Sequence, residues 1–540
     1  MNSFPSTSGR SRFQWRREER WLDRLCWWGL LAAALLLLVS NLGTAPLANG
    51  EEATLAQIGK EMARSLFKTL PVWQNPDGAW WSQKGWHILN NLFEGNLGQS
   101  FTLDGQAWMP TLWDKPIAQP PLIPWIMALS YGLGGIHELT IRLPFAVLTA
   151  LSVPLLYGLA QELFRQRLTA LYAGLIYLTS ISLVYGGRWA TSQGLCLLLT
   201  VLFLGETLRV RRNLQFAWSL GLILTLLLLT QPLLALLLLV TAIAFWAWDT
   251  PRLLRSPLLW WGIMLGALPG LGWYGWHSYS LHQNFWQSLG HIAVPKTVLP
   301  WHQVVGFYGG KLLQNSLPWL LFAFSGITIA WKSFPWSWAR FLISFGCGYL
   351  LLITLLPSPW ELGLTPLYPL LALTGAIALA ELRQLDPEIP YPQSWVIFFA
   401  VTALTLLGLT LILYQEIPLI NLAKPERASA ILLFLFLGFT LGMTANLLAQ
   451  RQRDFVPILF WGIFLSLMLW VQTPLWLWHP RADFPVKAIG QLIQKQVPAK
   501  ETLYGTLPQE NTALNFYSDR RVLPISFKKL QDYWKQTEQP

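Results

Sequence analysis

The stretch WWGLLAAALLLLVSNL, from Trp27 to Leu42, is a long apolar run that follows a basic amino terminus. The first 24 residues contain six arginines. A helix that crosses a bilayer needs about 20 mostly apolar residues, and flanking Arg or Lys keeps that flank in the cytoplasm. The stretch therefore predicts an uncleaved first membrane helix over roughly residues 24–44. A cleavable signal ending near Ala45–Ala48 is the alternative, although such signals have a shorter apolar core.

The composition extends this prediction to the whole chain. Of 540 residues, 53% are apolar and only 12% are charged, whereas soluble proteins carry about 25% charged residues. The net charge of +11 lies largely in short Arg-rich loops, so it indicates topology and not nucleic-acid binding. Cys26, Cys196 and Cys347 lie in or beside apolar runs, without the spacing of a metal site or a disulfide framework.

Thirteen apolar segments are long enough to be considered as membrane spans once the positive-inside rule decides the ambiguous ones. They cover roughly 24–44, 140–163, 168–186, 193–208, 214–230, 233–248, 257–276, 316–331, 341–356, 364–382, 394–414, 428–448 and 455–477. We therefore predict an all-α polytopic membrane protein with about 13 transmembrane helices. Because the basic amino terminus is expected in the cytoplasm, an odd number of spans places the carboxy terminus in the periplasm.

Three parts follow from these spans. Residues 1–23 form a basic cytoplasmic terminus, and residues 24–477 form a transmembrane domain. Its large outer loops cover 45–139, with juxtamembrane helices, and 277–315. Residues 478–540 are polar, with a helical pattern and strand-like alternation between turn residues, which predicts a small periplasmic α/β domain. No internal repeat is evident by eye, which disfavours a transporter built on inverted repeats.

An acidic pair opens the first outer loop. NGEEATLAQIGKEM, from Asn49 to Met62, places Glu51 and Glu52 after a turn signal and at the start of a helical pattern. Two carboxylates at a helix start stabilise its dipole by a few tenths to about 1 kcal/mol, which is a purely structural explanation. The functional alternative is a catalytic base or a metal-binding carboxylate at the membrane surface.

Several cations lie on the same predicted side. Lys115 follows Asp114 in WDKPIAQPPL, where it either snorkels at the interface or binds phosphate as a point charge. Arg142 and Arg188 lie on the outer side, where the positive-inside rule disfavours them, and boundary arginines of this kind are functional candidates.

The second outer loop adds further basic and aromatic residues. They are Lys296, His302, Tyr308 and Lys311. Residues of these types contact phosphate and sugar in binding sites, or anchor a loop at the interface.

The order of these pieces resembles the family of membrane glycosyltransferases that includes protein O-mannosyltransferases and the lipid A aminoarabinose transferase. EEATLAQIGKEM fits the family pattern DE-x-RY-x-x-IA-x-EM, with Glu51 in place of the leading Asp. DKPIAQPPL resembles the family's DKPPL, and GGRWATSQGL resembles GR-x-A-x-x-D, with Gln193 in place of the acid. ELTIRLPFAVLTALSVPLLYGLAQELF resembles the family's next helix. A Ser-Lys pair expected near residue 360 is replaced by Ser358–Pro359–Trp360.

The resemblance implies the C-type glycosyltransferase fold and a specific activity. A sugar would move from a polyprenyl-phosphate-linked donor to a lipid, polysaccharide or protein acceptor at the outer face. Glu51 would be the catalytic base, with Glu52 beside it. The donor phosphate would be bound by cations, namely Lys115, Arg188, Arg142, Lys296 and Lys311. The substrate cavity would be lined by Asp114, Gln193, His302 and Tyr308.

The remaining expectations concern cofactors, alternatives and location. Some relatives bind a divalent metal, but no metal cage is recognisable in this sequence, so no cofactor is predicted and a divalent metal is left open. A transporter or flippase of lipid-linked sugars and an inactive member of the same fold remain alternatives. The expected partners are the donor, the acceptor and membrane lipids, with no nucleic acid. The short loops favour the bacterial inner (plasma) membrane.

Overall fold

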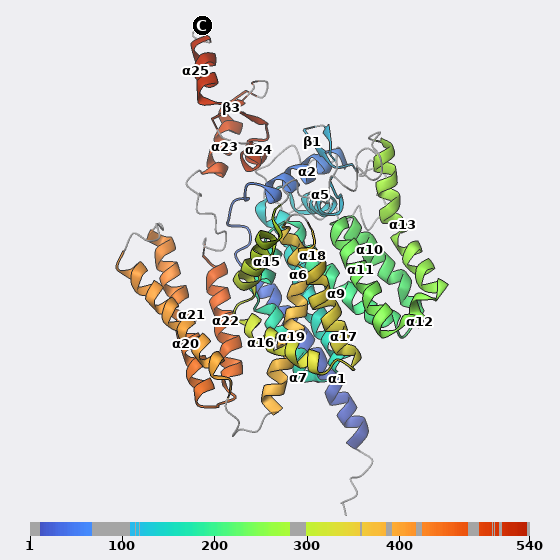
Figure 1. Cartoon of the computed structure of the whole chain (residues 1–540). Helices are drawn as coiled ribbons and strands as arrows, with labels where there is room; N and C mark the ends of the chain where they lie inside the picture. The colour runs from blue at the N-terminus through green and yellow to red at the C-terminus, as the bar shows by residue number, and fades with distance from the viewer. Residues whose placement is uncertain are drawn as a thin grey trace, which may run out of the picture.

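The chain forms a long helical bundle with a layer of shorter elements at one end (Figure 1). The computed structural model describes residues 11–66, 109–113, 115–117, 119–280, 299–356, 359–384, 391–416, 424–473, 485–498, 501, 503–506 and 510–536. The bundle contains α1 (Ser11–Val39), α6 (Glu138–Phe164), α7 (Arg167–Leu178), α8 (Ile181–Arg188), α9 (Ser192–Val210), α10 (Ala217–Leu228), α11 (Pro232–Asp249), α13 (Pro257–Ser280), α16 (Trp319–Lys332), α17 (Ser337–Ile343), α18 (Tyr349–Thr354), α19 (Leu367–Gln384), α20 (Gln393–Tyr414), α21 (Lys424–Ala449) and α22 (Phe455–Val471).

The end layer is made of segments from the first outer loop, the second outer loop and the carboxy-terminal part. Its elements are α2 (Glu51–Leu66), β1 (Thr111–Leu112), β2 (Lys115–Pro116), α5 (Leu122–Gly134), α15 (Trp301–Ser316), η5 (Glu361–Leu364), α23 (Val486–Gln496), β3 (Leu503–Gly505), α24 (Thr512–Ser518), β4 (Val522–Pro524) and α25 (Phe527–Gln536). Strands β1 and β2 form an antiparallel hairpin, and β3 pairs with β4 in parallel. Figure 1 shows α2, α5, β1 and α24 at the end of the bundle opposite to the start of α1.

All thirteen predicted spans coincide with helices, but the number of transmembrane helices is not confirmed. Within the described ranges, eight helices are long and apolar enough to cross a membrane, and up to ten if two bent pairs each count as one span. The pairs are α7 with α8, bent by 55°, and α15 with α16, bent by 111°. The other predicted spans correspond to helices that are too short, such as α10 and α22, or to the Trp- and Gly-rich α13.

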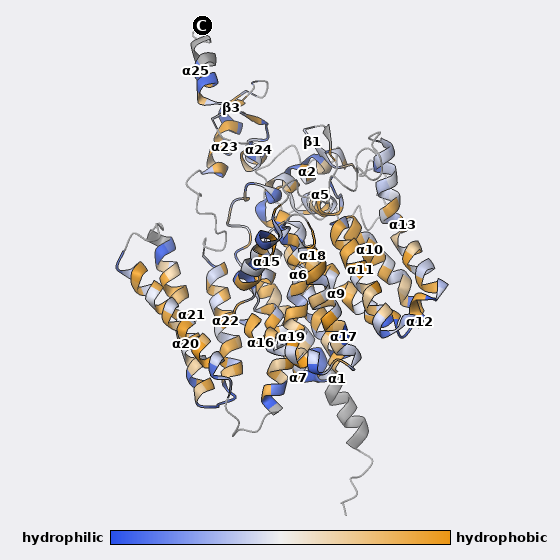
Figure 2. Cartoon of the chain, viewed as in Figure 1, coloured by the Kyte–Doolittle hydropathy of each residue, from blue (hydrophilic) through white to orange (hydrophobic). Residues whose placement is uncertain are grey.

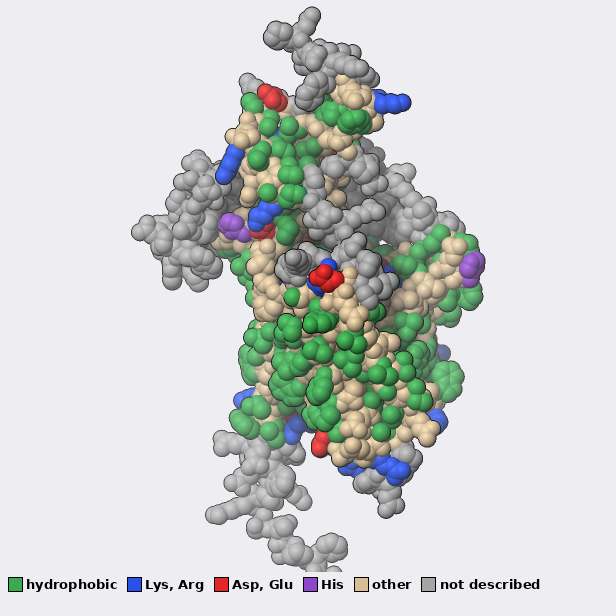
Figure 3. All heavy atoms as spheres, turned by 90° about the vertical axis from the view of Figure 1, so that its left-hand side faces the viewer, with side chains coloured by type: hydrophobic (Ala, Val, Ile, Leu, Met, Phe, Trp, Pro, Cys, Tyr) green, Lys and Arg blue, Asp and Glu red, His purple; other side chains and the backbone are tan. Residues whose placement is uncertain are grey.

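The surface of the bundle has the polarity of a membrane protein. Hydrophobic residues cover the middle of the helices, and hydrophilic ones gather towards both ends (Figure 2). The space-filling view shows the same band of hydrophobic side chains, with most Lys and Arg above or below it (Figure 3). The basic residues that end α9, α16 and α19 lie at the end where α1 begins. This protein is therefore a multi-span membrane protein.

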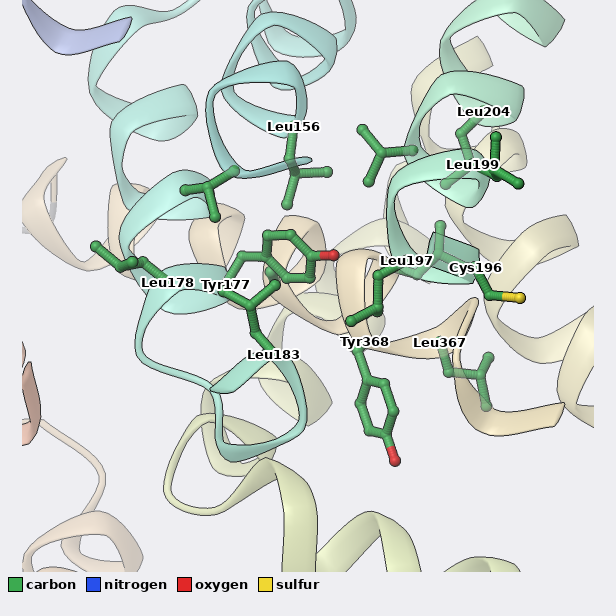
Figure 4. Close-up of a cluster of buried hydrophobic side chains, with 14 of the residues drawn as sticks. Leu156, Tyr177, Leu178, Leu183, Cys196, Leu197, Leu199, Leu204, Leu367 and Tyr368 are labelled. Atoms are coloured by element: carbon green, nitrogen blue, oxygen red, sulfur yellow. The ribbon is translucent and has the colours of Figure 1, made fainter. Parts of the chain in front are cut away.

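The core lies where α6, α7, α8, α9 and α19 meet. Tyr177, Leu183 and Leu197 are fully buried there, and Figure 4 shows them pointing toward one another from three helices. Cys196 lies in the same cluster, as expected for a small core residue, whereas Cys347 is exposed. Close packing of apolar side chains at this point holds the bent pair α7–α8 against the longer helices.

In the carboxy-terminal part, α23 lies in the predicted helical stretch, and β3 and β4 lie in the stretch with strand-like alternation. Between the two strands the prediction is wrong, because Thr512–Ser518 form helix α24, whose start is capped by the side chain of Asn511. The boundary predicted at residue 478 falls outside the described residues, so it stays a prediction. A separate carboxy-terminal domain is not confirmed, because α24 packs directly against α2.

Helices α10 and α13 approach each other closely through glycines. A Cβ added to Gly266 would lie 2.4 Å from the carbonyl oxygen of Trp218 and 2.7 Å from Cα of Gly221. Small residues at such crossings allow the van der Waals contacts that hold membrane helices together. On the same helix, a Cβ added to Gly272 would meet nothing within 4 Å.

We predict that Gly266→Ala destabilises the protein, because the added methyl group forces the two backbones apart at a cost of about 1–3 kcal/mol. Gly272→Ala is the matched control, and the higher helix propensity of Ala predicts equal or greater stability for it. Thermal unfolding of both purified variants in detergent, followed by tryptophan fluorescence, measures the difference. Equal melting temperatures for the two variants would contradict this account of the α10–α13 contact.

Candidate functional site

Helix α2 lies across the outer-loop end of the bundle and carries the predicted acidic pair in its first turn. Its two carboxylates have opposite environments, since Glu51 is exposed and Glu52 is buried. Successive residues of an α-helix point about 100° apart. The side chains of Glu51 and Glu52 therefore face different elements of the protein and have different partners.

Glu52 forms a buried ion pair with Arg142 of α6. Nε of Arg142 lies 2.7 Å from Oε1 of Glu52, Nη2 lies 2.9 Å from Oε2, and both side chains are 1% exposed or less. The carboxylate also accepts hydrogen bonds from the backbone N–H groups of Ala48 and Ala190, at 2.9 and 3.2 Å. A buried pair of this kind is stable when the remaining hydrogen-bonding groups are satisfied. Glu52 therefore joins α2, α6 and the turn between α8 and α9.

Arg142 also holds the chain that connects α1 to α2. Its guanidinium donates to the carbonyl oxygens of Leu42, Ala45 and Pro46, at 3.2, 2.7 and 2.9 Å. With the bidentate bond to Glu52, the guanidinium is surrounded by protein acceptors. The structure thus places Arg142 in the interior, although the sequence predicted a phosphate-binding role for it.

Arg188 of α8 forms similar hydrogen bonds to backbone carbonyl oxygens at the end of α1. Its guanidinium donates to the carbonyl oxygens of Leu37, Leu38, Ser40 and Asn41, at 2.7–3.3 Å. The last four carbonyls of a helix have no partner within the helix, and a cation there also interacts favourably with the helix dipole. The side chain is 0% exposed. Arg188 is therefore a buried cap of α1 in this structure, and the predicted contact with substrate phosphate has no support from its position.

Glu51 faces the start of α9. Its Oε1 accepts a hydrogen bond from the Ser192 hydroxyl at 2.9 Å and lies 3.4 Å from the Ser192 backbone nitrogen. Nε2 of Gln231 lies 3.4 Å from the same hydroxyl oxygen. Ser192 is the first residue of α9, where the helix dipole favours a negative charge. Glu51 is thus an oriented and exposed carboxylate.

The neighbouring Gln193 is half-buried and packs on α8. A Cβ added to Gly186 would lie 2.8 Å from Cγ of Gln193, so only glycine leaves room for this side chain. Gln193, which was predicted to line the substrate cavity, directly follows Ser192, the residue that forms a hydrogen bond with Glu51.

Glu61, near the end of α2, holds the hairpin that contains the DKP sequence. It accepts hydrogen bonds from the backbone N–H of Trp113 at 3.0 Å and from the Thr111 hydroxyl at 3.2 Å. Lys115 belongs to this hairpin, with its Cα paired with that of Leu112. Sequence reasoning gave Glu61 no role beyond its match to the family pattern, which was the signal available for it.

Some predicted residues lie outside the described part of the chain. Asp114 and Lys296 are among them, as is the side chain of Lys115. Their roles stay predictions.

Helix α15 contributes the other predicted residues. Nζ of Lys311 lies 2.9 Å from Oε1 of Glu361 in η5, and the two side chains are 29% and 49% exposed. The hydroxyl of the buried Tyr308 accepts a hydrogen bond from the backbone N–H of Trp360 at 3.1 Å. His302, at the start of α15, is exposed. Tyr308 therefore supports η5, and Lys311 remains a partly accessible cation.

The two sides of the site meet at α8. Helix α15 packs against α8 and η5. Tyr185 of α8 packs against Trp189 with ring centroids 5.2 Å apart, and Ala190, the residue after Trp189, donates its backbone N–H to Glu52 at 3.2 Å. The structure therefore brings the acidic pair of α2 and the Lys311–Glu361 pair to one end of the bundle.

Asp519, the residue that follows α24, contacts the carboxy-terminal half of α2. Asp519 pairs with the buried Lys60 at 3.0 Å and with Arg64 at 2.6 Å. Burial lowers the pKa of Lys60. Burial alone would raise the pKa of Asp519, but the adjacent Lys60 and Arg64 outweigh it and hold that pKa below its ordinary value. The carboxylate thus stabilises the contact at neutral pH, and this contribution is lost only as the pH falls through the lowered pKa.

Among the described residues, no group of three or more His, Cys, Asp or Glu side chains is placed to hold a metal ion.

The sequence and the fold were compared with known proteins. Residues 118–276 match a family model described as dolichyl-phosphate-mannose-protein mannosyltransferase, which covers α5 to most of α13. None of the curated proteins matches the sequence.

Two solved structures of ArnT show a similar fold over almost the whole chain. The crystal structure of ArnT from Cupriavidus metallidurans bound to undecaprenyl phosphate superposes with a TM-score of 0.66 at 16% identity, covering 94% of this chain and 88% of that one. Its apo form gives 0.66 at 17% identity, with 94% and 90% covered. The oligosaccharyltransferase of Archaeoglobus fulgidus gives 0.48 at 11% identity, with 93% and 64% covered. The expected resemblance is confirmed: the chain has the C-type glycosyltransferase fold of the lipid A aminoarabinose transferase ArnT, and its residues 118–276 match the dolichyl-phosphate-mannose-protein mannosyltransferase family.

Proposed function

We propose that this protein is a glycosyltransferase that moves a sugar from a polyprenyl-phosphate-linked donor to an acceptor at the outer face of the membrane. The acceptor is a hydroxyl of a lipid, a polysaccharide or a protein. One observation carries the proposal: Glu51 is an exposed carboxylate, oriented by Ser192, at the end of a membrane bundle with the fold of ArnT. The likeness to a structure that holds undecaprenyl phosphate supports this donor class.

In the proposed reaction, Glu51 accepts the proton of the acceptor hydroxyl. The acceptor oxygen forms a bond to the anomeric carbon of the sugar while the bond from that carbon to the phosphate oxygen breaks. The polyprenyl phosphate leaves with the electron pair of that bond. A carboxylate held within reach of the reacting hydroxyl is the group that general-base catalysis requires, and the hydrogen bond from Ser192 restricts its orientation.

The contacts of the other charged residues support a division of roles that differs from the sequence-based one. We assign Glu52, Arg142 and Arg188 to the support of the site, because all three are buried and their charged groups form hydrogen bonds with other protein atoms. Cations stabilise the charge that develops on a leaving phosphate. Lys311 suits this task because it is partly exposed. Lys115 and Lys296 remain proposed phosphate ligands, and His302 and Gln193 remain proposed cavity residues.

The distribution of basic residues supports the proposed orientation. Arginines and lysines end several helices at the side where α1 begins, and such residues mark the cytoplasmic side. The site then faces the periplasm of a bacterial inner membrane, and the carboxy terminus lies on the same side. A polyprenyl-linked donor and a lipid acceptor would both reach the site by diffusion within the membrane.

A direct test uses the purified protein in liposomes with a radiolabelled polyprenyl-phosphate sugar and a cell-envelope extract as acceptor. Transfer of label to any acceptor would support the glycosyltransferase. Movement of the donor across the bilayer without transfer would show a flippase instead.

We predict that Glu51→Gln lowers kcat by a factor of about 10²–10⁴, the usual contribution of a general base. Glu51→Asp keeps the carboxylate and should retain part of the activity. Because Glu51 is exposed, neither substitution should change the melting temperature. An E51Q protein that transfers sugar at the wild-type rate would rule out Glu51 as the base.

Glu52→Gln should instead destabilise the fold. It leaves Arg142 buried without its opposite charge, and breaking a buried pair in this way costs about 3–5 kcal/mol. Chemical unfolding of E52Q and E51Q in the same detergent gives a matched comparison, because the two changes are chemically identical and adjacent in sequence. If E52Q is as stable as E51Q, the buried pair does not have the structural importance assigned to it.

A further inference from the structure

The carboxy-terminal helix α24 contacts the residues immediately before Glu51. Oδ1 of Asn49 accepts hydrogen bonds from the backbone N–H and from the hydroxyl of Thr512, both at 3.0 Å. The backbone N–H of Gly50 lies 3.3 Å from the same hydroxyl oxygen. Gly50 has a positive φ of 110°, a conformation that glycine adopts readily. Thr512 therefore holds the turn that sets the direction in which α2 begins.

A second contact lies two residues further back along the chain. The hydroxyl of Tyr517 accepts a hydrogen bond from the backbone N–H of Leu47 at 2.8 Å and donates one to Oε1 of Glu138 at 2.9 Å. Lys487 of α23 pairs with the same carboxylate oxygen at 2.5 Å. Tyr517 thus joins the chain before α2 to the first residue of α6.

A third contact fixes the last turns of α2. Nζ of Lys60 donates to the backbone carbonyl oxygen of Phe516 at 3.1 Å and lies 4.8 Å from the centre of the Phe516 ring. Asp519, the residue after α24, also pairs with Lys60 and Arg64 of α2. The contacts with α24 and Asp519 therefore lie on both sides of Met62 in the sequence of α2. The start and the end of α2 are therefore both bound to one carboxy-terminal helix.

We propose that α24 is a positioning element of the active site, and that Thr512 and Tyr517 determine where the Glu51 carboxylate lies. The inference rests on the proposed function, since it takes Glu51 as the base. Its physical basis is that the contacts at residues 47–50 and 60–64 hold the backbone of α2 in place, while the hydrogen bond from Ser192 orients the Glu51 side chain. Small misplacement of a catalytic group lowers the rate strongly, because the reacting atoms must lie within a narrow range of distance.

The experiment compares two substitutions of nearly equal size at one position. Thr512→Val removes the hydroxyl and keeps the shape, whereas Thr512→Ser keeps the hydroxyl. Tyr517→Phe removes the second contact in the same way. Arg521→Gln is the control, because Arg521 pairs with Glu510 inside the carboxy-terminal segment and not with α2. Initial rates with the polyprenyl-phosphate sugar give kcat and the donor KM, and amide hydrogen exchange without substrate reports on residues 47–58.

We expect T512V and Y517F to lower kcat by about fivefold to tenfold with little change in the donor KM, since the interaction lost is one that acts on the base. Exchange in residues 47–58 should become faster in both. T512S and R521Q should behave like the wild type. A loss of stability alone would not lower kcat while leaving the donor KM unchanged. Nor would it explain why T512S keeps the wild-type kcat when T512V does not.

Two outcomes would overturn the proposal. The first is unchanged kcat in both T512V and Y517F, whatever happens to the exchange, because α24 would then not determine the position of Glu51. The second is a fall in kcat that T512S and R521Q share with T512V. A wild-type protein that transfers no sugar would refute the proposed function itself. In that case the exchange data alone decide whether α24 holds residues 47–58, with faster exchange in T512V and Y517F supporting it and unchanged exchange overturning it.

Discussion

The buried ion pair between Glu52 and Arg142 is the interaction on which the outer end of this protein depends. Removing two charges from water is unfavourable, and their mutual attraction compensates only when the geometry is good and the remaining groups are paired. Here the pair is bidentate, and both partners make further hydrogen bonds to backbone atoms. One consequence is that α2, α6, the chain after α1 and the turn before α9 are all fixed relative to one another.

A second constraint concerns the point where α1 leaves the bundle. A helix end exposes carbonyl groups that need partners, and a membrane protein has little water near its core to supply them. The guanidinium groups of Arg188 and Arg142 donate hydrogen bonds to carbonyl oxygens between Leu37 and Pro46. Arg142 and Arg188, which the positive-inside rule disfavours on the predicted outer side, therefore have a structural explanation in the connection between α1 and α2. Backbone carbonyl groups that need hydrogen-bond donors are a sufficient reason for an arginine at this position, without a bound ligand.

Helix α2 shows how one short amphipathic helix can organise a site. Glu51 faces α9, Glu52 faces α6, Glu61 holds the β1–β2 hairpin, and Lys60 contacts α24. Each polar side chain contacts a different segment, and these segments are far apart in the sequence. The position of Glu51 is thus the outcome of its own hydrogen bond with Ser192 and of the contacts that the other polar residues of α2 make.

The sequence by itself determined the class of protein, the apolar segments that become helices of the bundle and the resemblance to a glycosyltransferase family. Apolar length and Arg-rich loops act locally, so they can be recognised without coordinates. It did not determine the number of spans, because α10 and α22 are too short to count as spans, and α7–α8 and α15–α16 are bent pairs that can each be counted as one span or as none. Through the resemblance it predicted Glu51 as the base, but it did not show that Glu51 is exposed and Glu52 buried, nor could it distinguish a ligand-binding arginine from a buried one. Those differences arise when segments distant in the chain, from α6 to α24, pack around α2 and leave one carboxylate in solvent and the other enclosed.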